Sequence, residues 1–476
     1  MVLVLAAVCV ERTLRLKAPP RLSATPDAFG FDEAATAAHL AQALRFPTVS
    51  TQAGRADDAA YGAACDALHA WLERTYPKLS ASLGRERVGA HALLFTWKGT
   101  TAAAPLILLA HQDVVPVDAP AKWTHAPFAG DVADGFVWGR GAIDDKVSLV
   151  GILEAVERLL ERGFAPSRTL YLALGADEEI GGGDGAVRIA ALLKERGVTP
   201  ALLVDEGGAV VGGVIPGLAR PLASVGIAEK GYASVRLTVT GPGGHSSQPP
   251  RQSNIGVLAA ALARLEAHPM PASLRNVERM APYLAPELPF GQRLALANLW
   301  LFGPFVERAF AANPTSDATL RTTTAVTMVS GGVKENVLPQ SATAVVNFRV
   351  FPGDTVAGVV EHVRRVVGDE RVDVELLTAT LSEASRESSW TSPAFAAVED
   401  AIARVWPEAV TAPGLVLGAT DERHYAALGG DAYRFTPVSL ERDDLPRIHG
   451  ADERVPAGAP ARAARFYAEL VSAFAK

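Results

Sequence analysis

Polar residues with metal-binding chemistry follow three apolar runs of this sequence. They are His111 and Asp113 after LILLA at 106–110, Asp177 to Glu179 after TLYLALG at 169–175, and Asp205 and Glu206 after PALLV at 200–204. Carboxylates that crowd together raise one another's pKa unless a cation lies among them. Imidazole and carboxylate ligands suit zinc, manganese or cobalt. The residue types therefore predict a metal site without cysteine ligands.

A fourth contribution comes from GRGAIDDK at 139–146, where Asp144 and Asp145 precede an apolar helical pattern. The N-terminus of a helix favours negative charge. If His111, Asp144, Glu179, Asp205 and a distant histidine were the ligands, three carboxylates would bring a charge of −3. One divalent ion would leave the site with a negative net charge, and two ions would leave it with a positive net charge. A positive net charge favours an attacking hydroxide and an oxyanion. The charge balance predicts two ions that share Asp144.

The elements that carry these residues are short apolar strands alternating with amphipathic helices. SLVGILEAVERLLERG at 148–163 and GAVRIAALLKERG at 185–197 have apolar residues at helical spacing and end in glycine. Continuous apolar strands separated by helices predict an α/β fold, with a mostly parallel sheet and helices on both faces. In such sheets the ligand site lies at the carboxyl ends of the strands.

The pattern changes from about residue 228. Strands at 232–241, 322–332, 342–352 and 372–377 and helices at 254–268 and 355–367 follow the order βαββαβ, which predicts an inserted ferredoxin-like α+β unit. A Pro-rich and Ala-rich stretch at 269–320 interrupts it and predicts extra helices or a lid. We therefore divide the chain of 476 residues into an N-terminal segment 1–29, a catalytic domain 30–227 and 381–476, and an inserted domain 228–380 that would include the lid.

Composition excludes several functional classes. The formal net charge of −7 argues against a nucleic-acid partner, and two cysteines are too few for a disulfide framework.

The apolar run Val2–Val10 is too short to span a bilayer, which needs about 20 residues. It fits either the stump of a membrane anchor or export segment, or a frayed apolar terminus. The sequence does not distinguish a cytoplasmic protein from one anchored or exported through this segment.

Seven motifs occur in order along almost the whole chain: HQD, PFAGDVADGFVWGRGAIDDK, GADEEIGG, VDEGG, GPGGHSS, KENVLPQSATAVVNFRV and RIHGADERV. Together they resemble the dinuclear zinc peptidases and amidohydrolases that include aminoacylase-1, carboxypeptidase G and carboxypeptidase S. GATDERHY, YRFTPV and HGADERV are most similar to the carboxypeptidase S branch, which includes N-acyl-amino-acid hydrolases. The resemblance implies a hydrolase that cleaves an amide or peptide bond next to a free carboxylate with two zinc ions, or with manganese or cobalt in their place.

The resemblance also implies roles for individual residues. His111, Asp144 and Asp205 would hold one ion, and Asp144, Glu179 and His449 the other. Asp113 would orient His111, and Glu178 would be the general base for the water that the metals activate.

His245 of GPGGHSS would reach the site of a partner subunit and stabilise the oxyanion there, which implies a homodimer through the inserted domain. Asn336 and Arg349 resemble the family's substrate-binding positions, and a planar guanidinium suits a carboxylate. The turn at Gly418 to Thr420 would add backbone N–H donors to that carboxylate.

Other functions have weaker support. An aminopeptidase or dipeptidase that reads a free amine is the alternative within the same chemistry. GGGDG at 181–185 lacks the lysine and hydroxyl residue of a phosphate loop, and no GxSxG serine-hydrolase motif occurs. His424 is a rival of His449 as the distant ligand. The substrate implied by the resemblance is a small peptide or an N-acyl amino acid.

Overall fold

A computed structural model describes residues 1–17, 27–51 and 59–476. Its centre is an eight-stranded sheet in the order β1-β2-β6-β3-β7-β16-β8-β15. The strands of this central sheet are β1 Gly84–Val88, β2 Ala92–Trp97, β3 Leu106–His111, β6 Leu170–Gly175, β7 Leu202–Gly212, β8 Leu222–Glu229, β15 Val410–Val416 and β16 Asp431–Glu441. The pairs β6–β3, β3–β7, β7–β16 and β8–β15 are parallel, whereas β1–β2, β2–β6, β16–β8 and β7–β8 are antiparallel.

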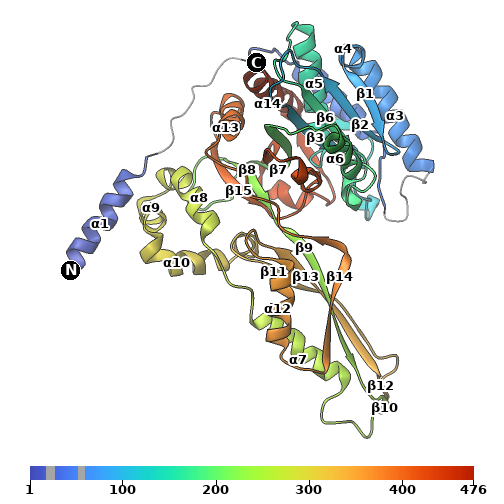
Figure 1. Ribbon diagram of the computed structural model, residues 1–476, viewed down its shortest axis with the longest axis vertical. Coiled ribbons are helices and arrows are strands. Elements are labelled where there is room, and N and C mark those ends of the chain that lie inside the picture. The colour runs from blue at the N-terminus through green and yellow to red at the C-terminus, as the bar shows by residue number, and fades with distance from the viewer. Residues whose placement is uncertain (18–26, 52–58) are drawn as a thin grey trace.

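Helices cover both faces of the central sheet (Figure 1). They are α2 Glu33–Leu44, α3 Ala59–Thr75, α4 Pro77–Ser82, α5 Lys146–Glu161, α6 Ala186–Glu195, α13 Pro393–Val405 and α14 Ala459–Phe474. Strand β3 shows why both faces need a cover. Leu108 packs into the core beneath α5 and α14, while Ile107 and Leu109 pack into a second core with α6. The continuous apolar run in the sequence reflects this two-sided burial.

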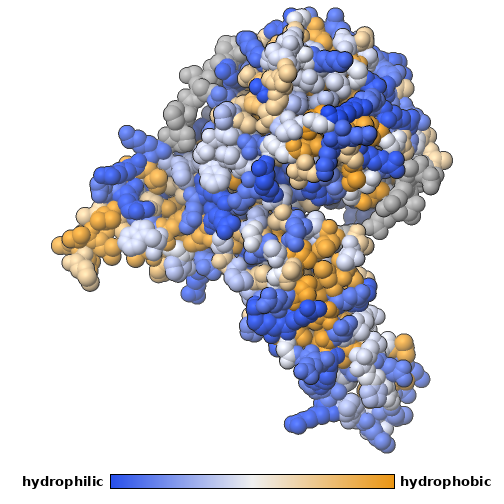
Figure 2. All heavy atoms as spheres, viewed as in Figure 1, coloured by the Kyte–Doolittle hydropathy of each residue, from blue (hydrophilic) through white to orange (hydrophobic). Residues whose placement is uncertain are grey.

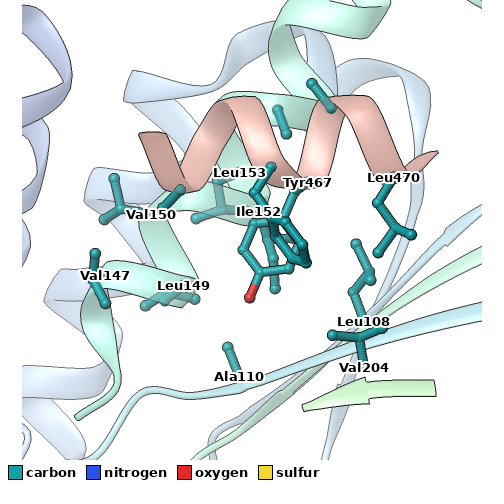
Figure 3. Packing of buried hydrophobic residues seen from close by; sticks show 14 of the residues in the cluster. Leu108, Ala110, Val147, Leu149, Val150, Ile152, Leu153, Val204, Tyr467 and Leu470 are labelled. Carbon is teal, nitrogen blue, oxygen red and sulfur yellow. The ribbon is translucent and has the colours of Figure 1, made fainter. Parts of the chain in front are cut away.

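The first core depends on close contact between α5 and α14, which lie far apart in the sequence. Figure 3 shows Val150, Ile152 and Leu153 of α5 beside Tyr467 and Leu470 of α14. At Gly151 an added Cβ would lie 2.8 Å from the Cβ of Ala463, so glycine allows the two helices to approach. Helix α5 begins directly after Asp144 and Asp145, so the C-terminal helix packs on the element that follows this loop.

The inserted unit is a four-stranded antiparallel sheet in the order β11-β13-β9-β14. Its elements are β9 Gly231–Thr240, β11 Thr323–Gly331, β13 Ser341–Val350 and β14 Val372–Ser382, with helices α7 Asn254–Ala267 and α12 Val356–Val367. Both helices contribute to its separate core. The sequence of elements and the strand order are those of a ferredoxin-like unit. The fold class predicted from the sequence is confirmed.

The stretch at 269–320 is helical, and we call residues 275–318 the helical insert. It contains α8 Arg275–Leu284, α9 Phe290–Ala297, α10 Leu299–Ala311 and α11 Pro314–Ala318. The N-terminal helix α1 Val2–Arg15 lies against it rather than against the central sheet (Figure 1). Among the described residues, no helix has the length and apolar character needed to cross a bilayer.

Candidate metal centre

Four residues from widely separated segments meet at the carboxyl end of the central sheet. His111 is the last residue of β3, and its Nε2 lies 2.8 Å from Oδ1 of Asp144. The other oxygen of Asp144 lies 3.0 Å from Nε2 of His449, which in turn lies 3.3 Å from Oε2 of Glu179. Asp144 therefore stands between two imidazoles, as a carboxylate shared by two ions would.

A second group of possible ligand atoms also includes His111. Atoms of His111, Glu178 and Glu206 lie within 4.8 Å of one another, and His111 Nε2 is 3.5 Å from Glu206 Oε1. Asp205 is buried beside this group. Its Oδ1 accepts the N–H of Glu206 at 2.9 Å and its Oδ2 accepts the N–H of Glu422 at 2.8 Å. The side chain that faces His111 here is Glu206.

Asp113 connects the histidine to the loop after β6. The His111 Nδ1 lies 2.9 Å from the backbone oxygen of Asp113 and 3.5 Å from its Oδ1. The Asp113 carboxylate accepts the N–H of Glu178 at 3.1 Å, that of Glu179 at 3.2 Å and the hydroxyl of Ser50 at 2.6 Å. Because it is fully buried and holds both segments, Asp113 fixes the relative position of His111 and the two glutamates.

Burial and the close approach of like charges shift the pKa values of the cluster. Burial raises the pKa of the Glu178 and Glu206 carboxyls well above the usual range, and nearby Asp421 and Asp144, respectively, raise them further. Burial alone would also raise the pKa of Asp144, but hydrogen bonds with His111 and His449 outweigh it and hold that pKa below its usual range. Hydrogen bonds with Asp144 and Glu179 raise the pKa of His449 to about 10.

These features fit a metal ion. Among the described residues, Glu179 Oε1 and Asp421 Oδ1 are buried without a hydrogen-bond partner. The Nε2 atoms of His111 and His449 that face Asp144 are the atoms that would bind a cation, because a metal ligand must be an unprotonated nitrogen. The donors are imidazole nitrogens and carboxylate oxygens, the set that suits zinc, manganese or cobalt.

A buried ion pair sets the positions of two candidate ligands. Arg140 Nη1 donates to Glu453 Oε2 at 2.6 Å, and both side chains are buried. The Glu453 carboxylate also accepts the N–H groups of Gly141 at 2.9 Å, Ile143 at 2.8 Å and Asp144 at 3.2 Å. Arg140 Nη2 donates to the backbone oxygen of His449 at 3.1 Å. The pair thereby joins the loop that bears Asp144 to the loop that bears His449.

The remaining predicted site residues lie on other parts of the chain. His245 is exposed on β10 Gly244–His245, which pairs with β12 Val337–Leu338. Asn336 is next to β12, and its backbone oxygen accepts the N–H of Ser246 at 3.2 Å. Figure 1 shows β10 and β12 at the end of the inserted sheet that points away from the central sheet.

Arg349 lies at the opposite end of the inserted sheet, where its guanidinium stands 4.8 Å from the ring centre of Tyr232. Gly418 is exposed in the turn after β15. Thr420 is buried, and both its N–H and its hydroxyl donate to Glu229 Oε2, at 3.0 and 2.8 Å. The rival histidine His424 is half-buried, and burial lowers its pKa to about 4.

The sequence analysis missed Arg140 and Glu453, and it named Glu206 among the acids at the strand ends without choosing it as a ligand. Glu206 follows Asp205 in VDEGG, and successive residues of a strand point to opposite faces. Arg140 and Glu453 occur in GRGAIDDK and RIHGADERV. An arginine and a glutamate more than three hundred positions apart give no local signal of pairing.

A cluster of imidazoles and carboxylates at the carboxyl edge of a mostly parallel sheet, with a further glutamate beside it, is typical of metal-dependent hydrolases. The sequence model of the protein family described as Peptidase family M20/M25/M40 matches residues 107–473 of this chain. The chain belongs to this family.

Curated relatives include a probable carboxypeptidase S-like protein of Dictyostelium discoideum, 41% identical over 423 residues, which are 88% of this chain and 81% of the relative. An N-fatty-acyl-amino acid synthase/hydrolase of Danio rerio is 43% identical over 391 residues, 81% of this chain and 76% of the relative. Carboxypeptidase S of Saccharomyces cerevisiae is 31% identical over 466 residues, 87% of this chain and 80% of the relative.

Solved structures show the same fold. A metallo-carboxypeptidase of this family from Sulfolobus solfataricus has a TM-score of 0.67 at 19% identity, and covers 93% of this chain and 99% of its own. A dinuclear metal-binding peptidase of the family from Bacillus subtilis has a TM-score of 0.58 at 16% identity, with coverage of 93% and 99%. The predicted family, the enzyme class and the hydrolysis of an amide or peptide bond next to a carboxylate are confirmed.

Proposed function

We propose that this chain is an N-acyl-amino-acid amidohydrolase that uses two zinc ions. The observation that carries the proposal is the position of Asp144 between His111 and His449, with Glu178 and Glu179 on the adjacent loop. The relative from Danio rerio, 43% identical, is named an N-fatty-acyl-amino acid synthase/hydrolase, and this supports an acyl amino acid as the substrate class. When bound, the ions would lower the pKa of water and polarise the amide carbonyl.

We propose that Asp144, Glu179 and His449 hold one ion, and that His111 and Asp144 hold the other together with Asp205. The contact between Glu206 and His111 makes Glu206 the competing candidate for that third position. Both acids stand at the same strand end, so each needs its own test. Neutral amides at the two positions, compared by metal content, separate the candidates.

Glu178 is the proposed general base. Its carboxylate is nearly buried, and its own N–H donates to Asp113, so its position is fixed relative to His111. Burial and Asp421 raise its pKa, which makes it a stronger base once it is ionised beside cations. It would take a proton from the attacking water and return it to the leaving amine.

His245 and Asn336 are proposed to serve the site of a second subunit. They lie together on the exposed tip of the inserted sheet, which points away from the metal centre of their own chain (Figure 1). Strand β11 is an edge strand, with Met328 and Val329 exposed. An exposed apolar edge supports pairing between two copies. The proposed assembly is a homodimer.

The proposed carboxylate-binding group is Arg349, with the turn at Gly418 to Thr420. The Arg349 guanidinium lies over Tyr232 at the end of β13 nearest the central sheet, and stacking on a ring leaves its N–H edge for a planar carboxylate. Both donors of Thr420 are engaged by Glu229, so its proposed role is to hold the turn.

The decisive experiment compares an N-acyl amino acid with the matching free-amine dipeptide as substrates for the zinc-loaded protein. We expect the acyl substrate to be hydrolysed faster, and the activity to disappear on chelation and in Glu178→Gln. Faster cleavage of the free dipeptide would instead identify a dipeptidase. Activity that survives thorough chelation would refute the metal-dependent mechanism.

A further inference from the structure

Three charged side chains form a buried network behind the candidate metal centre. Arg434 of β16 is fully buried, whereas Glu229 of β8 and Glu422 of the 3-10 helix Asp421–Leu428 are 2% and 5% exposed. Arg434 Nε donates to Glu229 Oε2 at 3.4 Å, and Arg434 Nη2 donates to Glu422 Oε2. Figure 2 shows hydrophilic residues spread over the outside of the part built on the central sheet, where charged groups ordinarily lie. We call the three buried residues the arginine network.

The strands around Arg434 leave room for a long side chain. Arg434 pairs with Asp205 of β7 on one side and with Gly226 of β8 on the other. A Cβ added at Gly226 would lie 3.2 Å from Arg434 Cβ, and one added at Gly207 would lie 2.9 Å from the same atom. Glycine at both positions therefore allows the guanidinium to lie between the two acids.

One acid of the arginine network orients a candidate zinc ligand. The backbone N–H of Glu422 donates to Asp205 Oδ2 at 2.8 Å, while the Glu422 carboxylate accepts from Arg434. The other oxygen of Asp205 accepts the N–H of Glu206 at 2.9 Å. Both oxygens of Asp205 are thus held by N–H groups, and one of these groups belongs to a residue that Arg434 binds.

The other acid holds the turn that is proposed to bind the substrate carboxylate. Glu229 Oε2 accepts the N–H of Thr420 at 3.0 Å and the hydroxyl of Thr420 at 2.8 Å, in addition to the bond from Arg434. One oxygen atom therefore joins the guanidinium to the end of the turn at 418–420. Removing its charge should loosen this turn and leave the metal ligands in place.

The same segment also reaches the proposed general base. Arg423 follows Glu422 directly, and its Nη1 lies 4.0 Å from Oε1 of Glu178. The arginine network holds Thr420 and Glu422, so the backbone that carries Arg423 is fixed at two nearby points. One guanidinium thereby influences a zinc ligand, the turn and a cation beside the base.

Stability alone explains the arginine network poorly. Removing charges from water costs about as much as their mutual attraction returns, so a buried ion pair is often no more stabilising than well-packed apolar groups. A fully hydrogen-bonded network of charged groups does restrict geometry, because each bond has a preferred direction. The geometry that is restricted here is that of the metal centre.

We propose that Arg434 is a positioning residue for the hydrolytic reaction. Through Glu422 it orients Asp205, and through Glu229 it holds the turn at 418–420. The inference rests on the proposed function, because Asp205 and the turn are themselves proposed site residues. The two connections have separate consequences: the one through Glu422 governs metal binding and kcat, and the one through Glu229 governs KM.

The experiment measures zinc affinity, kcat and KM for an N-acyl amino acid in variants that keep the side-chain shape. We expect Glu422→Gln to weaken binding of one of the two zinc ions by about tenfold to a hundredfold, and to lower kcat with little change in KM. Glu229→Gln should raise KM by about tenfold and leave zinc affinity unchanged.

Variants of the arginine itself should combine the two effects. Arg434→Met should show both the loss of zinc affinity and the rise in KM. Arg434→Lys keeps the charge but loses the fork of N–H donors, and should retain more activity than Arg434→Met. Urea unfolding shows whether each variant folds. If Arg434→Met does not fold, the two glutamine variants still decide the question.

Arg279→Lys is the matched control. Arg279 of α8 forms a two-bond pair with Glu387 at 2.8 and 2.5 Å, and its side chain is 11% exposed. Neither residue is a proposed site residue, so this variant should change neither zinc affinity nor KM.

Two results would overturn the proposal. One is unchanged zinc affinity in Glu422→Gln together with unchanged KM in Glu229→Gln. The other is an equal loss of folding stability in all the variants, the control included, without the separate effects on zinc affinity and KM. Failure of the proposed function is distinguishable from both, because it appears in the unchanged chain: a chain that takes up no zinc or hydrolyses no N-acyl amino acid would refute the proposed function, and this inference with it.

Discussion

The substitution Glu453→Gln tests the role of the buried ion pair behind the metal centre. In the unchanged chain the Glu453 carboxylate accepts one N–H from Arg140 and three from the backbone at 141–144. Glutamine keeps the shape of the side chain but removes the negative charge and places an NH2 group among these donors. The guanidinium of Arg140, 2% exposed, then has no ionic partner among the described residues.

The expected cost follows from this burial. Removing one partner of a buried pair leaves an uncompensated charge, and typically costs about 3–5 kcal/mol of folding free energy. The matched control is Glu86→Gln, which breaks a two-bond pair with Arg196 whose side chains are 41% and 38% exposed. An exposed pair contributes about 1 kcal/mol or less. The two substitutions change the same functional group and differ mainly in burial.

Urea unfolding of the metal-free proteins measures both costs. We expect a much lower midpoint for Glu453→Gln and a nearly unchanged midpoint for Glu86→Gln. Zinc titration of the two variants should show weakened binding in Glu453→Gln alone, because Glu453 accepts the N–H of Asp144. Equal shifts for the two variants, or unchanged zinc affinity in Glu453→Gln, would refute the reasoning.

Further predictions concern the site residues one by one. Glu178→Gln should lower kcat by at least about a hundredfold and leave metal content unchanged, as measured by mass spectrometry of metals, if it acts as a base and not as a ligand. Metal content should fall in Asp205→Asn and stay constant in Glu206→Gln; the opposite result would exchange their roles. In the metal-free protein the pKa of His449 is raised to about 10, so its contribution to stability is complete below its unfolded pKa of about 6.5 and disappears as the pH rises through about 10. The stability difference between the unchanged chain and His449→Gln, followed by urea unfolding against pH, should vanish there, and a difference that grew with pH would contradict this. Mixing inactive Glu178→Gln with inactive His245→Ala should restore about one quarter of the activity if subunits exchange in a homodimer, whereas restoration of none would count against a shared site.

The sequence by itself determined the order and type of the main elements. The apolar run at 106–110 and the helical spacing at 148–163 are local patterns, and both were found in the structure as β3 and α5. The arrival of acids and a histidine at strand ends also follows from local order, because parallel strands bring their carboxyl ends to one edge. The chemical nature of the site was therefore predictable from the sequence.

Only the tertiary structure decided which side chains meet. His449 meets Asp144 across 305 positions, and the Arg140–Glu453 pair spans a similar separation. The choice between Asp205 and Glu206 depends on which face of β7 turns toward His111. The position of helix α1 depends on a hydrogen bond from the buried Asn298 of the helical insert. These contacts arise from the packing of remote segments, and residue patterns along the chain carry no information about the distance between them.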